Sequence, residues 1–183
     1  MSRTLRVGSQ RLIAAVLDCE KPVIASVQGA AAGIGSHLAL ACDFVVAAND
    51  ARFIEVFVRR ALVPDGGGTY LLPRLIGPQR TKQLMMLGDD LPVPEAAGLG
   101  LVTDVVAPGE LDARVGELAS RLAEAPTRTL AAIKWLVNSS LSSSREQAFA
   151  EEAIAQERNM LTEDATEGLA SFTERRPARY RGR

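Results

Sequence analysis

Two glycine clusters hold the residues whose types and spacing are suited to chemistry. The first is the turn Gly29-Ala-Ala-Ala-Gly33-Ile34-Gly35, and the second sets an acid among glycines, in Pro64-Asp65-Gly66-Gly67-Gly68. Where a strand runs into a glycine-rich turn and then a helix, backbone N–H groups point outward at the positive end of the helix dipole. Such a turn can bind a phosphate, or it can stabilise negative charge that develops on a carbonyl oxygen.

Phosphate binding has a candidate family behind it, because Gly-x-x-x-Gly-x-Gly is the glycine spacing of the short-chain dehydrogenases. Those enzymes also need a tyrosine followed four residues later by a lysine. Here Tyr70 is followed at that spacing by Arg74. A glycine fingerprint without its catalytic partner is a weak signal, so we favour the second chemistry.

The elements around the first cluster alternate between strand and helix. Val23–Val27 and Phe44–Ala48 are short apolar runs, residues 36–42 between them have a helical composition, and residues 52–56 are mostly extended. Because both runs are apolar on both sides, they predict a largely parallel sheet covered on both faces. An amphipathic helix over residues 3–19 is expected to precede them.

The second cluster leads into a helix over residues 69–87, which we expect to break at Pro73 and again near Gly77-Pro78. A short helix from Pro94 follows, and the chain then turns into a strand that ends at Val106. After Pro108 four helices are expected, over residues 110–124, 127–140, 144–161 and 162–175. The sequence therefore predicts a core, residues 1–107, and a carboxy-terminal helical region, residues 108–183.

The composition excludes several classes of protein. The chain of 183 residues is 47% hydrophobic and 23% charged, as in ordinary globular domains, and its net charge of -1 attracts neither nucleic acid nor an anionic membrane. It has no apolar run of the roughly 20 residues that a membrane span needs. Cys19 and Cys42 lack metal-ligand spacing, and we expect both to be reduced. The prediction is a cytoplasmic protein without a metal and without a nucleic-acid or membrane partner.

Segments along the whole chain resemble the enoyl-CoA hydratase/isomerase, or crotonase, family. These segments are Lys21–Gly29, Leu40–Asp43, Ala51–Phe53, Leu62–Gly68, Leu72–Gly77 and Phe172–Tyr180. The resemblance implies an α/β fold, a spiral of ββα units that is incomplete at the amino end, with a helical oligomerisation region after it. It implies an acyl-CoA thioester as the partner, with coenzyme A as part of the substrate and no separate cofactor. It also implies a homotrimer or a dimer of trimers.

The resemblance assigns site residues as well. The N–H of Ile34, between Gly33 and Gly35, would hold the thioester oxygen, and Asp65 matches the single acid of the family's isomerases. Gly66, Gly67, His37 and Phe57 would line the substrate. Two plainer interpretations stay open, because the glycines can serve close packing alone and Asp65 can cap the helix that starts at Gly66–Thr69.

The family's hydratases use two glutamates, and this chain has His37 and Phe57 at those positions. Hydration needs one group to deprotonate water and another to deliver a proton to the α-carbon, so isomerisation is favoured. His37, the only histidine, is expected to have a hydrogen-bonded structural role. Glu55 lies near the second hydratase position without matching it, and we expect a surface or rim charge there.

Compared with the family, the sequence starts just before the helix that precedes Pro22. The family's earlier part supplies the other oxyanion N–H and residues that bind adenine. Without one of two donors, we expect transition-state stabilisation to fall by about 2.7–4 kcal/mol.

The sequence thus predicts an enzyme that isomerises an enoyl-CoA through a thioester enolate, with Asp65 as acid and base. One alternative is a hydratase or another thioester chemistry on the same fold. The other is a CoA-binding or assembly protein without catalysis.

Overall fold

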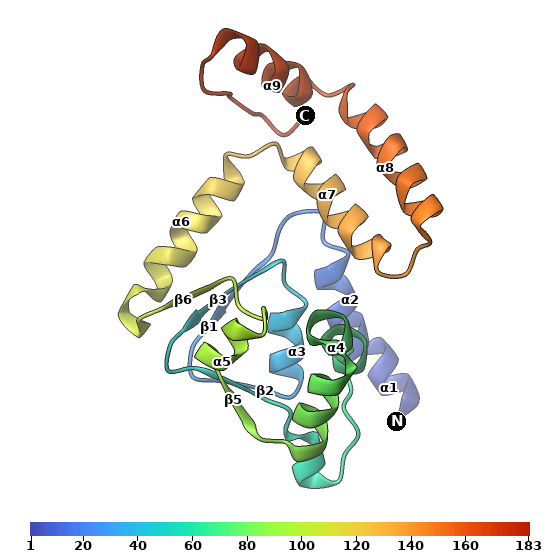
Figure 1. The fold of residues 1–183 in the computed structure, drawn as a ribbon, viewed down its shortest axis with the longest axis vertical. Helices are drawn as coiled ribbons and strands as arrows, with labels where there is room; N and C mark the ends of the chain where they lie inside the picture. Colours follow the sequence, from blue (N-terminus) through green and yellow to red (C-terminus); the bar gives the residue numbers. More distant parts are fainter. The chain divides into compact units, whose positions relative to one another are not determined.

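The computed structural model describes residues 1–183, and the contacts within it divide the chain into two units. The first comprises residues 1–19 and 23–116, and the second comprises residues 20–22 and 117–183. In Figure 1 the first unit runs from blue to yellow, and the second continues to red apart from its short blue segment. The roles assigned to residues 1–107 and 108–183 stay predictions.

One of two sheets in the first unit is wholly parallel. It consists of β1 (Ile24–Val27), β3 (Phe44–Ala48) and β6 (Asp104–Val106), in the order β1-β3-β6. The central strand carries the core, because Val46, Ala47 and Ala48 are fully buried. The predicted sheet, parallel and covered on both faces, is confirmed for this strand.

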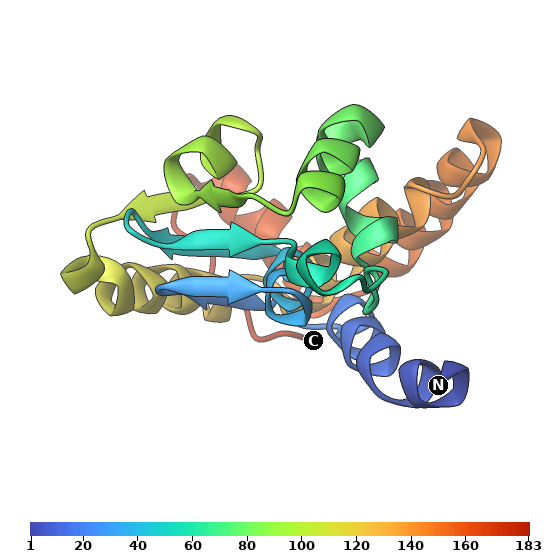
Figure 2. The same cartoon turned by 90° about the horizontal axis from the view of Figure 1, so that it is seen from below.

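The second sheet consists of β2 (Ala30–Ala32), β4 (Arg52–Ile54) and β5 (Asp90–Pro92). β2 and β4 are parallel, whereas β4 and β5 are antiparallel. In this sheet β4 lies between β2 and β5. Figure 2 shows the strands of both sheets, coloured from blue through teal to yellow-green along the chain. β2 lies inside the glycine turn, where the sequence predicted no strand, because three alanines carry little β-propensity and only the pairing with β4 makes them a strand.

The first four strands alternate between the two sheets, and each consecutive pair of them leads into a helix. β1 and β2 are followed by α3 (Ile34–Leu40), and β3 and β4 are followed by the 3₁₀ helix η1 (Val56–Arg60) and then α4 (Gly68–Leu87). This repeat of two strands and a helix is the expected spiral of ββα units. It brings the start of α3 and the start of α4 together, since the two helices pack against each other.

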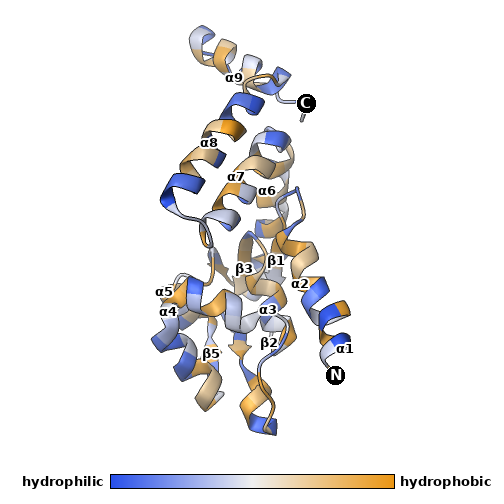
Figure 3. Cartoon of the chain, turned by 90° about the vertical axis from the view of Figure 1, so that its right-hand side faces the viewer, coloured by the Kyte–Doolittle hydropathy of each residue, from blue (hydrophilic) through white to orange (hydrophobic).

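The amino-terminal helix breaks where one helix was expected. One helix over residues 3–19 was predicted, whereas the chain forms α1 (Ser2–Val7) and α2 (Ser9–Leu17), because the backbone of Gly8 is non-helical. Glycine is among the residues that favour a helix interior least. Figure 3 shows hydrophobic and hydrophilic residues on α2, whose buried residue Ile13 packs with Ala41 and Leu71.

Helix α4 bends at only one of the two places expected. Gly77 has a non-helical backbone just before Pro78, as predicted, whereas the chain stays helical at Pro73. Leu71 and Leu72, directly before Pro73, are buried in the core, and we attribute the continued helix to this packing. The short helix α5 (Val93–Gly98) follows β5.

The helices after Pro108 are confirmed to within two residues at each end. They are α6 (Leu111–Ala123), α7 (Thr127–Ser140), α8 (Arg145–Asn159) and α9 (Glu163–Glu174), and a short 3₁₀ helix that was not predicted, η2 (Pro108–Glu110), precedes them. Two of these helices begin at a side-chain N-cap. The Ser144 hydroxyl accepts a hydrogen bond from the Gln147 N–H at the start of α8, and the Thr162 hydroxyl accepts one from the Ala165 N–H at the start of α9.

Helices α8 and α9 expose large apolar side chains in the second unit. Phe149 and Ile154 on α8, and Leu169 and Phe172 on α9, are all exposed, and Figure 3 shows orange and blue on both helices.

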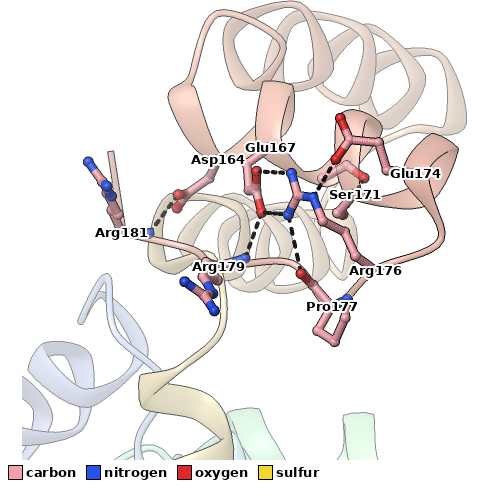
Figure 4. Close-up of polar contacts among 9 residues, drawn as sticks. Asp164, Glu167, Ser171, Glu174, Arg176, Pro177, Arg179 and Arg181 are labelled. Carbon is pink, nitrogen blue, oxygen red and sulfur yellow. Dashed lines mark hydrogen bonds and ion pairs between the residues drawn. The ribbon is translucent and has the colours of Figure 1, made fainter.

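The carboxy-terminal tail folds back onto α9. The buried carboxylate of Asp164 accepts hydrogen bonds from the N–H groups of Arg181 and Gly182, at 2.7 and 2.8 Å. Glu167, one turn further along, accepts two hydrogen bonds from the Arg176 guanidinium, at 2.6 and 2.8 Å, and one from the Arg179 N–H (Figure 4). Glu163 and Glu174 also pair with tail arginines, so four carboxylates of one helix hold the tail.

The ion pair at Glu167 predicts acid sensitivity in this tail. Hydrogen bonds from the Arg176 side chain and then the Arg179 N–H lower the pKa of Glu167 from 4.5 to about 2. A carboxyl with a lowered folded-state pKa stabilises the fold above its unfolded pKa and loses that contribution as the pH falls. We expect the difference in Tm between wild type and Glu167→Gln to shrink between pH 4.5 and 2.

Circular dichroism melts of both proteins at a series of pH values measure this difference. Glu124→Gln, at an exposed position, is the control for removal of a charge as such. A Tm difference that stays constant down to pH 2 would contradict the prediction.

The packing of α4 predicts which of its leucines stabilises the fold. Leu72 is 1% exposed, whereas Leu75 on the same helix is 46% exposed. We expect Leu72→Ala to lower the free energy of unfolding by about 2–5 kcal/mol, because it leaves a cavity. Leu75→Ala should change it by about 0.5 kcal/mol or less. Urea denaturation measures both, and equal losses would show that the core does not lie where the structure has it.

Candidate active site

The glycine turn reaches helix α3 through Gly33, whose backbone and surroundings both require glycine. Its φ of 54° lies in the left-handed region, and a Cβ there would lie 3.3 Å from Cγ2 of Val56. The Gly33 N–H donates to the Ile54 carbonyl at 2.9 Å. Close packing alone thus accounts for Gly33, whereas a Cβ at Gly35 would meet nothing within 4 Å.

Ile34 is the first residue of α3, so its N–H has no acceptor inside the helix. The Ile34 side chain is 38% exposed and lies beside Gly66, where a Cβ would come within 3.2 Å of Cγ1 of Ile34. The predicted oxyanion turn and the loop that carries the acid therefore meet at these two residues.

The acid loop is held in a conformation that favours glycine. Gly66 and Gly67 have φ values of 60° and 85°. Gly67 is the N-cap of α4, and no side chain donates or accepts a capping hydrogen bond there. Asp65, half-buried, therefore does not cap α4, and its carboxylate makes no hydrogen bond or ion pair within the chain. The helix-cap interpretation of Asp65 is wrong.

Beneath this loop lies a buried polar pair, His37 and Glu55. Nε2 of His37 lies 2.9 Å from Oε2 of Glu55, and the Ser36 hydroxyl donates to Oε1 of Glu55 at 3.2 Å. His37 is fully buried and Glu55 is 4% exposed. A surface or rim charge was predicted for Glu55, and that prediction is wrong. Glu55 directly follows β4, and its carboxylate turns inward, where it hydrogen-bonds to the imidazole of His37 on α3.

The phenyl ring of Phe57 covers the other side of this pair. It stacks on the imidazole with ring centroids 5.5 Å apart and an interplanar angle of 13°. Phe57 also contacts the turn, since a Cβ at Gly33 would lie 3.5 Å from its Cζ. The structural role expected for His37 is thus supported by a hydrogen bond and an aromatic contact.

The sequence-predicted residues are only partly gathered. Gly33, Ile34, His37, Phe57 and Gly66 contact one another in a chain. A Cβ at Gly67 would instead lie 3.4 Å from Cγ2 of Ile13 on α2, and a Cβ at Gly35 would meet nothing within 4 Å.

The site contains no candidate metal centre, and no group of three or more His, Cys, Asp or Glu side chains in residues 1–183 is placed to hold a metal ion. None of the helices combines the length and the apolar character that a membrane span requires.

Comparison with known proteins identifies the family. The family model for enoyl-CoA hydratase/isomerase matches residues 2–183. The chain belongs to this family. The resemblance seen in the sequence is confirmed, and so is the fold expected from it.

Two curated relatives carry different reaction names. A crotonyl-CoA hydratase from Syntrophomonas wolfei is 39% identical over 171 residues, 93% of this chain. A 1,2-epoxyphenylacetyl-CoA isomerase from Escherichia coli is 36% identical over 172 residues, 94% of this chain. The chain spans 66% of the length of each.

Solved structures of the family superimpose closely. An enoyl-CoA hydratase/isomerase from Cupriavidus metallidurans matches with a TM-score of 0.94 and 36% identity, over 99% of this chain and 68% of its own. An enoyl-CoA hydratase from Polaromonas sp. matches with a TM-score of 0.92 and 37% identity, over 96% and 68%. The family members share the fold while their names divide between hydratase and isomerase.

Proposed function

We propose that this chain shifts the double bond of an enoyl-CoA thioester, with Asp65 as the single acid and base. One observation carries the proposal. The carboxylate of Asp65 is half-buried and unpaired, and it stands next to Gly66, which packs against the residue whose N–H would hold the thioester oxygen. An acid held by glycines beside a helix start, without a structural partner, is available for proton transfer.

The reaction needs one proton carrier. The Asp65 carboxylate takes a proton from C2 of a 3-enoyl thioester, and the C–H electron pair forms the enolate, whose negative charge lies on the thioester oxygen. The Ile34 N–H donates to that oxygen. Protonated Asp65 then returns the proton to C4, which leaves the double bond between C2 and C3. Asp65 ends as it began.

Hydration is the second candidate, favoured by the hydratase names of several relatives. It requires two acid–base groups, and Phe57 cannot be one of them. The acyl-CoA partner, the absence of a separate cofactor and the cytoplasmic location are part of the same proposal.

Self-association as a homotrimer or a dimer of trimers is also proposed. Support comes from the exposed apolar side chains of α8 and α9, such as Phe149 and Phe172. Light scattering tests it, and a monomer at high concentration would exclude it.

The proposal predicts that Asp65→Asn greatly slows turnover and leaves binding of the CoA ester intact. Added to 3-hexenoyl-CoA, wild type should produce the absorbance of the conjugated 2-hexenoyl thioester, and Asp65→Asn should lower this rate by about 10²–10⁴-fold. Binding of the CoA ester, measured by calorimetry, should survive. Asp50→Asn, at an exposed turn, is the matched control.

Three outcomes separate the candidates. Undiminished turnover in Asp65→Asn rules out Asp65 as the acid. A hydrated product from 2-hexenoyl-CoA favours a hydratase, and binding without any product favours the CoA-binding protein.

A further inference from the structure

The imidazole of His37 lies beneath both halves of the proposed site. It extends from α3, three residues beyond Ile34. The acid loop rests on the same ring, because a Cβ at Gly66 would lie 3.7 Å from Nδ1 and a Cβ at Gly68 would overlap the ring atoms. The ring therefore fills the space between the turn that offers the Ile34 N–H and the loop that presents Asp65.

Glu55 holds this ring in place. Taking Glu55 as a carboxylate, which only accepts hydrogen bonds, we assign the proton of the 2.9 Å contact to Nε2 of His37. Ser36 donates to the other carboxylate oxygen, and Phe57 stacks on the ring. With the ring fully buried, these contacts fix both its plane and its position.

The second ring nitrogen, Nδ1, has no partner, although it is buried. A buried polar atom without a partner is costly, so a histidine is a poor choice for filling space alone. Nε2 of His37, however, makes the hydrogen bond to Glu55. This hydrogen bond, and not the volume of the ring, is what a histidine provides here and an apolar ring would not.

We infer that His37 is a positioning residue, which Glu55 holds and which sets the separation between the Ile34 N–H and the Asp65 carboxylate. The inference rests on the proposed function, since it concerns how the two proposed groups are kept apart. His37 acts through the loop and takes no proton from the substrate.

Gly68 gives the sharpest test. Its φ is not in the left-handed region, so alanine fits the backbone, and the three atoms nearest to an added Cβ all belong to the imidazole of His37. We expect Gly68→Ala to displace the loop and lower kcat by about 10²-fold, with a small change in KM. In a His37→Ala background the added methyl group meets no ring, so the double variant should be no slower than His37→Ala. Gly116→Ala, where a Cβ meets nothing within 4 Å, is the matched control and should keep wild-type kcat.

Glu55 separates positioning from loss of the fold. Glu55→Ala should lower kcat about tenfold or more, and Glu55→Gln should recover most of that loss, since an amide oxygen still accepts the Nε2–H. His37 is the only histidine, so nitrogen-15 NMR of the imidazole has a single source. It should show the proton on Nε2 in wild type and in Glu55→Gln, and circular dichroism checks the fold of each variant.

The results for the Gly68 and Glu55 variants can be told apart from the test of the proposed function. An active wild type with an inactive Asp65→Asn establishes the proposed function whatever the Gly68 and Glu55 variants do. Given that result, wild-type kcat in Gly68→Ala, additive losses in the double variant, or no recovery in Glu55→Gln would overturn the positioning role. If wild type itself forms no 2-hexenoyl thioester, the proposed function and this role fall together.

Discussion

The backbone of the acid loop approaches the imidazole of His37 more closely than any side chain at Gly68 would allow. This approach is the constraint on which the site depends. It requires a glycine on one side, and on the other a flat, buried ring. Glu55 holds the edge of this ring by a hydrogen bond and Phe57 stacks on its face. A buried carboxylate would be costly by itself, and its two hydrogen bonds, from His37 and Ser36, offset that cost.

The fold explains why these groups meet although they are far apart in sequence. Because β1 to β4 alternate between the two sheets, the ends of β2 and β4 lie side by side, with Ala32 paired to Ile54. The turn after β2 and the segment after β4 therefore emerge together. The first begins α3 and carries His37, and the second provides Glu55 and Phe57. The acid loop then closes over them as it enters α4.

The family of this chain follows from its sequence and fold, whereas the reaction depends on which groups in the site can transfer protons. The fold is that of the enoyl-CoA hydratases and isomerases, and relatives of similar identity carry either reaction name. What separates the two reactions is the set of proton carriers in the site. Here one carboxylate, Asp65, is free of partners, and the other, Glu55, is committed to the imidazole. This difference in pairing is the physical basis for choosing isomerisation.

The sequence by itself predicted most of the helices and the central buried strand, and it marked the residues of the candidate site. The apolar run Phe44–Ala48 predicted the buried strand, caps and proline positions predicted the helices after Pro108, and glycine spacing marked both the turn and the loop. These signals are local, because they depend on neighbours a few residues away. The assignment of Ile34 and Asp65 to chemistry came from resemblance and stays a prediction.

Only the tertiary structure decided how the marked residues are used. Glu55 looks like a surface charge in sequence, yet it is buried, because its partners lie 18 and 19 residues away along the chain. Asp65 has the sequence of a helix cap, yet Gly67 holds that position. β2 is a strand only because β4 lies beside it. For Glu55 and for β2, the deciding energy comes from contacts with residues distant in sequence, which local propensity does not include.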